Sequence, residues 1–353
     1  MSLLILQAIR VLISTGIAFL IALFLTPIWD KFLHKYKMGK QIRMSGETPI
    51  YSGLHAAKAG TPTMGGVIIW FTVLGLAALF FISSRLFDGP FKYLDFIDRT
   101  QTYLPIAAML IAAILGLIDD LMGVLRIGPN GGGLKVRHKL ILYAVIAALG
   151  AWWFYFKLDW TTLYVPFFGL RQIGFWYFPL FMFIIIASAF SANETDGLDG
   201  LLAGVSLFAF GALTAVAFSL GRYDLAVFGG VVIGALLAFL WFNIYPTRFF
   251  MGDTGSMALG ITMGVIAMLT NTTLFLPFFG FILVAESLSV IVQMISKKLF
   301  KKKIFLSTPI HHHFEALGWH ETKVTMRFWI VSVISCILGL VLFLMSKFLF
   351  LIK

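Results

Sequence analysis

The sequence predicts an all-α, polytopic integral membrane protein, from its composition and from the length of its apolar runs. Of the 353 residues, 60% are hydrophobic and only 12% are charged, whereas a soluble domain is about 45–50% apolar and about 25% charged. The apolar runs are long and continuous, unlike the short alternating segments of a membrane β-barrel. A soluble enzyme and an intrinsically disordered chain are therefore excluded.

About ten transmembrane helices are expected, because each crossing takes roughly 20 apolar residues. The first is interpreted as a retained span rather than a signal peptide, since it lacks a basic flank and a small-residue cleavage site. The single cysteine, Cys336, lies in an apolar run and permits no disulfide. The predicted spans cover residues 8–28, 65–82, 103–118, 138–156, 174–191, 201–220, 225–243, 256–270, 274–296 and 327–349.

The distribution of positive charge predicts the orientation. An even number of spans puts both termini on one side, and most of the 27 Lys and Arg fall in the loops after odd-numbered spans. Positive charge accumulates in cytoplasmic loops, so these loops are predicted to be cytoplasmic and both termini extracytoplasmic. The net charge of +11 then reflects topology, and no nucleic-acid partner is expected. The basic run 297–303 either fixes topology or binds anionic lipid.

Carboxylates and glycines gather in the same predicted cytoplasmic loops. The segment Lys58-Ala-Gly-Thr-Pro-Thr63-Met-Gly-Gly66 is either a phosphate-binding turn before a helix or an ordinary Pro-Gly turn. Asp119 and Asp120 end the third span, where two adjacent carboxylates oppose the helix dipole. They favour a bound cation or substrate, with solvated loop-edge acids as the alternative.

Two further loops carry acids beside helix-breaking residues. In Asn193-Glu-Thr-Asp196-Gly-Leu-Asp199-Gly, the two Asp share one face if a helix has begun; otherwise Asp196 is a helix N-cap. In the segment 241–256, Asp253 is expected to cap the eighth span. This segment also offers Arg248 for phosphate, and Phe249 and Phe250 for stacking against a base.

The run His311-His312-His313 follows Pro309. Consecutive histidines on a helix point in different directions, so the run alone makes a poor zinc site. A loop donating to a diphosphate and a surface histidine cluster are the two alternatives. Deep in an apolar segment, Glu286 is either functional or hydrogen-bonded between helices.

Taken together, these loops predict a Mg²⁺ site, because Mg²⁺ prefers carboxylate oxygens with waters and substrate phosphates as further ligands. The motifs at 58–66, 119–120, 195–200, 250–253 and 309–313 occur together and in this order. In this combination the chain resembles the phospho-N-acetylmuramoyl-pentapeptide transferase family, within the polyprenyl-phosphate N-acetylhexosamine-1-phosphate transferase superfamily. The resemblance runs from about residue 10 to the end of the chain.

The resemblance implies a single ten-span catalytic domain over residues 1–353, in the bacterial plasma membrane and usually homodimeric, with its site on cytoplasmic loops and helix ends. It implies transfer of phospho-MurNAc-pentapeptide from UDP-MurNAc-pentapeptide to undecaprenyl phosphate with Mg²⁺, giving lipid I and UMP. The catalytic residues it implies are Asp119, Asp120, Asp253 (the metal ligand) and His311. The substrate-binding residues it implies are Lys58, Thr63, Lys139, Asn193, Asp196, Asp199, Asn243, Phe250, His312 and His313.

The chain departs from the family pattern at Gly123, Glu194 and Phe190, where Lys, Leu and Asn are usual. A sister transferase using UDP-GlcNAc is the nearest alternative function. A cation-coupled transporter is disfavoured, because transporters place their sites near the bilayer midplane and only Glu286 lies deep in a span. The reaction is either a direct transfer or one through a covalent Asp intermediate.

Overall fold

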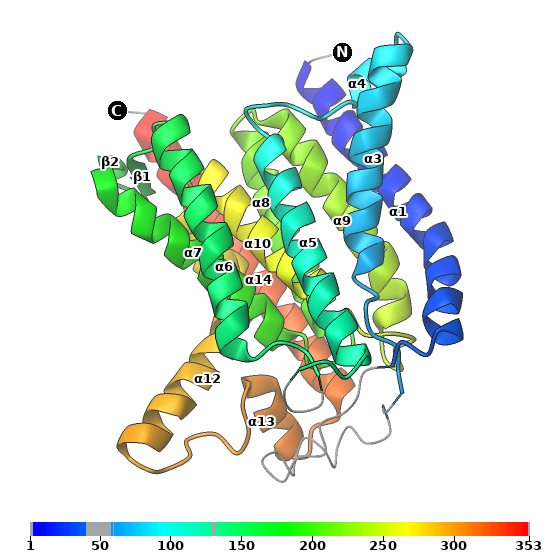
Figure 1. Ribbon diagram of the computed structural model, residues 1–353. Helices are drawn as coiled ribbons and strands as arrows, with labels where there is room; N and C mark the ends of the chain where they lie inside the picture. Colours follow the sequence, from blue (N-terminus) through cyan, green and yellow to red (C-terminus); the bar gives the residue numbers. More distant parts are fainter. Residues whose placement is uncertain (1–2, 40–57, 59, 129–131, 352–353) are drawn as a thin grey trace.

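The structure is a computed structural model that describes residues 3–39, 58, 60–128 and 132–351. Long helices run roughly side by side through most of the molecule (Figure 1). Its elements are α1 (Leu3–Lys35), α3 (Val67–Leu86), α4 (Pro90–Leu94), α5 (Tyr103–Val124), α6 (Val136–Trp152), η3 (Trp153–Lys157), β1 (Thr162–Val165), β2 (Gly169–Gln172), η4 (Gly174–Trp176), α7 (Tyr177–Thr195), α8 (Leu201–Ser219), α9 (Tyr223–Asn243), α10 (Asp253–Leu269), η5 (Thr273–Phe275), α11 (Leu276–Phe279), α12 (Phe281–Leu299), α13 (Ile310–Ala316) and α14 (Glu321–Leu351).

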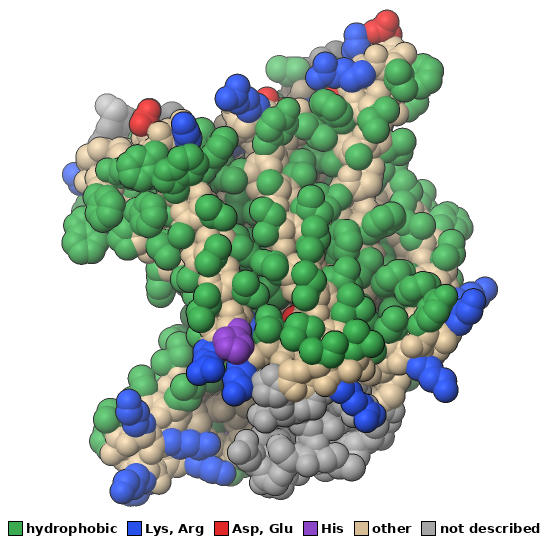
Figure 2. Space-filling model, viewed as in Figure 1, with side chains coloured by type: hydrophobic (Ala, Val, Ile, Leu, Met, Phe, Trp, Pro, Cys, Tyr) green, Lys and Arg blue, Asp and Glu red, His purple; other side chains and the backbone are tan. Residues whose placement is uncertain are grey.

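The all-α membrane fold is confirmed. Among the described residues, eight helices are long and apolar enough to cross a membrane, and nine if a bent pair counts as one span. The outer helices expose large apolar side chains such as Phe24 and Leu149, as a lipid-facing surface requires. Figure 2 shows this apolar surface around the middle of the molecule, with Lys and Arg at both ends.

Two of the predicted spans are not straight helices of full length. The predicted ninth span, 274–296, breaks at Gly280, and its two parts, 273–279 and 281–299, meet at 89°. In Figure 1, α12 consequently stands away from the bundle. The predicted eighth span is α10, which has 17 residues and is shorter than the roughly 20 residues that a crossing needs.

The helix α10 is nevertheless the centre of the fold. Every residue from Thr254 to Leu269 is buried, and the helix packs against α5, α7 and α8. A continuously apolar helix without a polar face is typical of a helix surrounded by protein. Its first residue is Asp253, so burial of α10 fixes the position of that carboxylate.

Both ends of the bundle carry short connecting elements. The described parts of the two termini lie at one end (Figure 1), as the even number of predicted spans requires. The hairpin β1–β2, in which Thr162 pairs with Gln172, lies at that end and was not predicted. The loops that carry the predicted site residues meet at the opposite end, here called the site end. Lys40 and Arg43, used in the orientation argument, lie outside the described residues.

Candidate functional site

The glycine-rich segment before α3 is used for packing between two loops. Gly65 N donates to Phe250 O and Gly66 N donates to Met251 O, both at 2.9 Å, while Phe250 N donates to Pro62 O at 2.8 Å. A Cβ added at Gly66 would lie 2.4 Å from Gly255 Cα, so only glycine permits this approach. These two N–H groups are therefore bonded to the 250–251 segment rather than presented to a phosphate, which favours the ordinary-turn alternative.

The loop before α10 is held by carboxylates from other elements. Gly252 has φ of 76°, a left-handed conformation that glycine adopts without a steric penalty. Asp196 Oδ2 accepts from Gly252 N at 3.2 Å, and Asp120 Oδ2 accepts from Thr254 N at 3.0 Å. Asp120 thus satisfies an N–H that the start of every helix leaves unpaired. Asp253 was predicted to cap this helix; it is instead the first helical residue, after Gly252.

Asp119, Lys139 and Asp253 form the first charged group, here called the Lys139 cluster. The Lys139 Nζ lies 2.8 Å from Asp119 Oδ2 and also contacts Asp253 Oδ2. Asn193 Nδ2 donates to Asp253 Oδ1 at 2.6 Å and to Ser256 Oγ at 3.2 Å. Four elements thus converge, from positions 119, 139, 193 and 253 of the chain.

Close approach of two helices brings these carboxylates together. A Cβ added at Gly116 would lie 2.3 Å from the Asp253 backbone oxygen, so α5 and α10 touch almost one turn before Asp119. Asp119 and Asp120 are only 5% and 7% exposed. The alternative of solvated loop-edge acids is therefore wrong.

The segment 196–200 is a turn between two helices. Asp196 follows the last residue of α7, and α8 begins at Leu201. Both predicted alternatives are therefore wrong, since Asp196 and Asp199 share no helix face and Asp196 is not an N-cap. A Cβ at Gly197 would lie 2.2 Å from His311 Nε2, which places this turn directly against the histidine helix.

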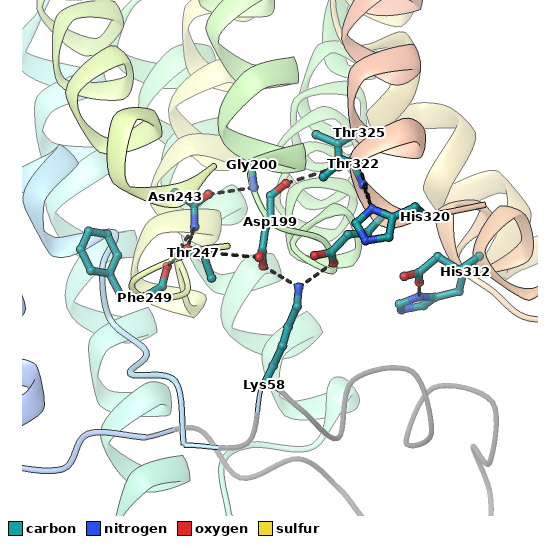
Figure 3. Close-up of polar contacts among 12 residues, drawn as sticks. Lys58, Asp199, Gly200, Asn243, Thr247, Phe249, His312, His320, Thr322 and Thr325 are labelled. Carbon is teal, nitrogen blue, oxygen red and sulfur yellow. Dashed lines mark hydrogen bonds and ion pairs between the residues drawn. The ribbon is translucent and has the colours of Figure 1, made fainter. Parts of the chain in front are cut away.

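Asp199, Lys58 and Glu321 form a second charged group, here called the Lys58 cluster. Lys58 Nζ lies 2.7 Å from Asp199 Oδ1 and 2.6 Å from Glu321 Oε2, and Figure 3 shows its side chain extending from the loop to Asp199. Burial alone would lower the pKa of Lys58, but its hydrogen bonds to the two carboxylates outweigh burial and raise that pKa above the usual value. Lys58 is thus firmly cationic.

Asn243, at the end of α9, shapes the neighbouring loop. Its side chain accepts from Gly200 N at 3.1 Å and donates to Phe249 O at 2.9 Å, as drawn in Figure 3. The Phe249 ring is fully buried and packs against Phe239 at 5.6 Å between centroids. The prediction that Phe249 offers a stacking face is therefore wrong, whereas Phe250 is only half-buried.

The three histidines lie on the short helix α13 rather than in a loop. His311 is fully buried and its Nδ1 lies 3.0 Å from Glu286 Oε2. His312 Nδ1 lies 2.6 Å from Glu315 Oε2, and His313 Nδ1 accepts from Leu306 N at 3.2 Å. The alternative of a surface histidine cluster is therefore wrong.

Electrostatics favour a protonated His311. Burial opposes the charged imidazole, but the nearby carboxylates of Glu286, Glu315 and Glu194 together raise the pKa of His311 above its usual value. Glu286 thus pairs with the histidine helix, and the bend of α12 brings it there. Glu286 Oε2 also accepts from His311 N at 3.4 Å, so Glu286 is hydrogen-bonded between two helices, as one of the two predicted alternatives required. A second inter-helix hydrogen bond is made by Ser287 Oγ, 2.7 Å from Ser191 Oγ.

The donor set of the Lys139 cluster fits a hard divalent cation. Asp119 and Asp253 offer carboxylate oxygens and Asn193 an amide, the oxygen donors that Mg²⁺ prefers. The Lys139 ammonium already lies between the two carboxylates, which marks the position as one that attracts positive charge. No group of three or more His, Cys, Asp or Glu side chains suited to a metal occurs within the described part of the chain. Substrate oxygens or waters would therefore have to complete the coordination, as is usual for Mg²⁺.

Sequence reasoning missed Glu321 and Ser256, and it left the role of Glu286 open. Glu321 stands in the first turn of the last helix, where an acid is expected merely to complement the helix dipole. Ser256 lies three residues after Asp253 on the same face of α10, a spacing that could have indicated it. The partner of Glu286 depends on the bend at Gly280, for which the sequence gives only that one glycine as a signal.

Comparison with known proteins gives consistent results. Residues 103–271 match the family model described as glycosyl transferase family 4, and residues 58–69 match phospho-N-acetylmuramoyl-pentapeptide-transferase signature 1. The phospho-N-acetylmuramoyl-pentapeptide-transferase of Clostridium novyi (strain NT) is 39% identical over 92% of this chain and 94% of its own. The proteins of the same name from Geobacillus sp. (strain WCH70) and Clostridium kluyveri (strain NBRC 12016) are each 38% identical, over 92% and 94% of this chain and 95% and 98% of their own.

Proposed function

This chain belongs to the phospho-N-acetylmuramoyl-pentapeptide-transferase family, and we propose that it makes lipid I at its site end. The reaction transfers phospho-MurNAc-pentapeptide from UDP-MurNAc-pentapeptide to undecaprenyl phosphate and releases UMP. The observation that supports this most strongly is the Lys139 cluster, which joins two carboxylates and an ammonium at one end of a membrane bundle. A charged site beside apolar helices suits a reaction between a water-soluble diphosphate and a lipid phosphate.

The site end is proposed to face the cytoplasm of a bacterial plasma membrane. Support comes from basic residues at this end, including Lys297 and Lys298 in the last turn of α12 and Lys323 and Arg327 near the start of α14, since such residues accumulate on the cytoplasmic side. UDP-linked sugars are made in the cytoplasm, so this orientation also places the donor substrate at the site.

The proposed chemistry is an in-line displacement at phosphorus. An oxygen of the lipid phosphate forms a bond to the phosphorus that carries the sugar, and the bond from that phosphorus to the UMP oxygen breaks. Catalysis of such transfers rests on positioning and charge stabilisation. Lys139 would stabilise the negative charge on the diphosphate, and Asn193 would hold the Asp253 carboxylate in place through its hydrogen bond.

Mg²⁺ is proposed as the cofactor, with Asp253 as its principal ligand and Asp119 close by. A bound Mg²⁺ would neutralise charge on the diphosphate as it develops. Asp120 and Asp196 are proposed to position the Asp253 carboxylate, because their oxygens accept from the backbone N–H groups of Thr254 and Gly252, on either side of it. Their removal would displace that carboxylate.

The nucleotide-sugar is proposed to bind between the Lys58 cluster and α13. Lys58 is a cation that pairs with Asp199, and Asn243, at the end of α9, accepts from the adjacent Gly200 N. The half-exposed Phe250 offers a ring to the uracil. Thr63, whose Oγ1 donates to Asp120 Oδ1 at 3.4 Å, is proposed to contact the substrate as well. His312 and His313 would contact the sugar-nucleotide, and His311 would hold α13 against the 196–200 turn.

The test is release of UMP by the purified full-length protein with undecaprenyl phosphate and Mg²⁺. Turnover of UDP-MurNAc-pentapeptide but not of UDP-GlcNAc is expected, and turnover of UDP-GlcNAc alone would overturn the substrate assignment. Incubation without lipid acceptor separates the two mechanisms, because a covalent phospho-sugar-enzyme forms only if an Asp is the nucleophile. The proposed homodimer is tested by the mass of the complex extracted with its surrounding lipid.

A further inference from the structure

A second charged region lies at the end of the bundle opposite the site end. A cavity of about 510 Å³ opens where four parts of the chain meet: the loop before α5, the end of η3, the turn between α8 and α9, and the end of α10. Its lining includes three basic side chains, Arg99, Lys157 and Arg222, and two aromatic ones, Trp153 and Trp160. Figure 2 shows Lys and Arg side chains at this upper end, above the apolar surface of the bundle.

The three cations lack a carboxylate partner within the described chain. The ion pairs found there include none to Arg99, Lys157 or Arg222. Of the three acids nearest in sequence, Asp224 pairs with Arg10 at 2.6 Å and Asp98 accepts from Thr100 N at 2.8 Å. The third, Asp159, is exposed and is not among the residues that line the cavity. Three like charges around one cavity repel one another and are relieved by a bound anion.

Two of the cations are also oriented by indole rings. The Arg222 guanidinium lies 5.7 Å from the centroid of the Trp160 ring, and Lys157 Nζ lies 5.6 Å from that of Trp152. Burial lowers the pKa of Arg222, because a charge removed from water is stabilised less well. A partly desolvated guanidinium binds phosphate oxygens strongly and in a bidentate manner.

The surroundings of the cavity match a lipid headgroup better than a free anion. Trp side chains gather at the level of lipid headgroups in membrane proteins, and Trp152, the last residue of α6, and Trp153, the first of η3, lie there. Beside them, Phe156 is 55% exposed and can lie against an acyl chain. A ligand with both a phosphate and an acyl chain uses all of these features.

We propose that this cavity is a binding site for the phosphate of an anionic membrane lipid, in the leaflet opposite the transferase site. Arg99, Lys157 and Arg222 bind the phosphate, and the Trp152–Phe156 surface contacts the acyl chain. Because three positive charges are present without a carboxylate, the site prefers a lipid of net negative charge to a zwitterionic one.

The experiment measures lipid retained on the purified full-length protein by native mass spectrometry, with phosphatidylglycerol or phosphatidylcholine added. Arg99 and Lys157 are exposed, so the double variant Arg99→Gln/Lys157→Gln should fold. Each basic residue near a charged lipid surface contributes enough that the pair is expected to change phosphatidylglycerol affinity about 30-fold. The control, Arg85→Gln/Arg171→Gln, removes the same charge from exposed positions outside the cavity and should retain the lipid.

Three results would overturn the proposal. Equal loss of phosphatidylglycerol in the control, or equal retention of the two lipids by the unmodified protein, would reduce the effect to general surface charge. Thermal protection by inorganic phosphate alone, with no lipid retained, would overturn the assignment to a lipid. Selective loss in the cavity variant, with protection by phosphatidylglycerol exceeding that by phosphate, supports it.

Discussion

Two lysines at the site end, Lys139 and Lys58, have similar ion pairs but connect different elements of the fold. Lys139 and Lys58 are each 16% exposed and each contact two carboxylates. The carboxylates that contact Lys139 belong to α5 and α10. Because α10 is buried along its length, its position is fixed by the surrounding helices. The comparison favours the Lys139 cluster as the proposed cation site, whereas Lys58 joins its own loop to the 196–200 turn and to the start of α14.

The largest expected effect is that of Asp253→Asn. The variant keeps the shape of the side chain but removes the charge that binds Lys139 and, as proposed, Mg²⁺. Metal stabilisation is worth several kcal/mol, so kcat for lipid I formation should fall about 10³-fold. Initial rates of UMP release measure this, and a near-normal rate with excess Mg²⁺ would remove Asp253 as the principal ligand.

Lys139→Gln should sharpen the comparison by raising the apparent affinity for Mg²⁺ while lowering the rate. Without the ammonium, Asp119 and Asp253 are left with uncompensated charge, so half-saturation with Mg²⁺ should occur at a lower concentration. The rate at saturating Mg²⁺ should nevertheless fall about 100-fold, because a cation that stabilises the diphosphate is lost. A Mg²⁺ titration of the rate reports both values, and unchanged half-saturation would contradict a shared cation position.

Lys58→Gln should act mainly on stability. It leaves Asp199 and Glu321 buried without their cation, and breaking such a buried pair costs about 3–5 kcal/mol. The melting temperature should fall clearly, and adding Glu321→Gln should recover part of the loss. A variant with an unchanged melting temperature and a reduced kcat would contradict this and would assign Lys58 a role in the reaction like that of Lys139.

The smallest effect concerns the pH dependence of the Glu286–His311 pair. The folded pKa of His311 is raised, so the pair contributes its full stability below the unfolded value of about 6.5 and loses it as pH rises through the folded value. Melting temperature should therefore decline over that range in the unmodified protein and decline less in Glu286→Gln. His34→Gln, on the exposed end of α1, serves as the control and should leave the slope unchanged.

Composition and apolar runs were enough to predict the bundle, because a segment that crosses lipid must be a helix of about 20 apolar residues. They failed at Gly280, where the predicted ninth span bends, and at α10, where protein rather than lipid surrounds the helix. The motifs also predicted a cluster that the structure forms at one end, since Asp119, Asp253 and Asn193 lie together there. They could not assign Asp120 to the start of α10, because that contact joins residues more than 100 positions apart. They could not assign Phe249 to the core, because its burial depends on how its loop packs against Phe239 of α9.

The most direct test of the site is Mn²⁺ binding, measured by electron paramagnetic resonance on the full-length protein with UDP-MurNAc-pentapeptide present. Mn²⁺ takes the oxygen ligands that Mg²⁺ takes, so a bound ion is expected in the unmodified protein and in Asp88→Asn, which alters an exposed acid outside the site. The signal of the bound ion should disappear in Asp253→Asn. Unchanged Mn²⁺ affinity in that variant would contradict the account of the Lys139 cluster as the cation site.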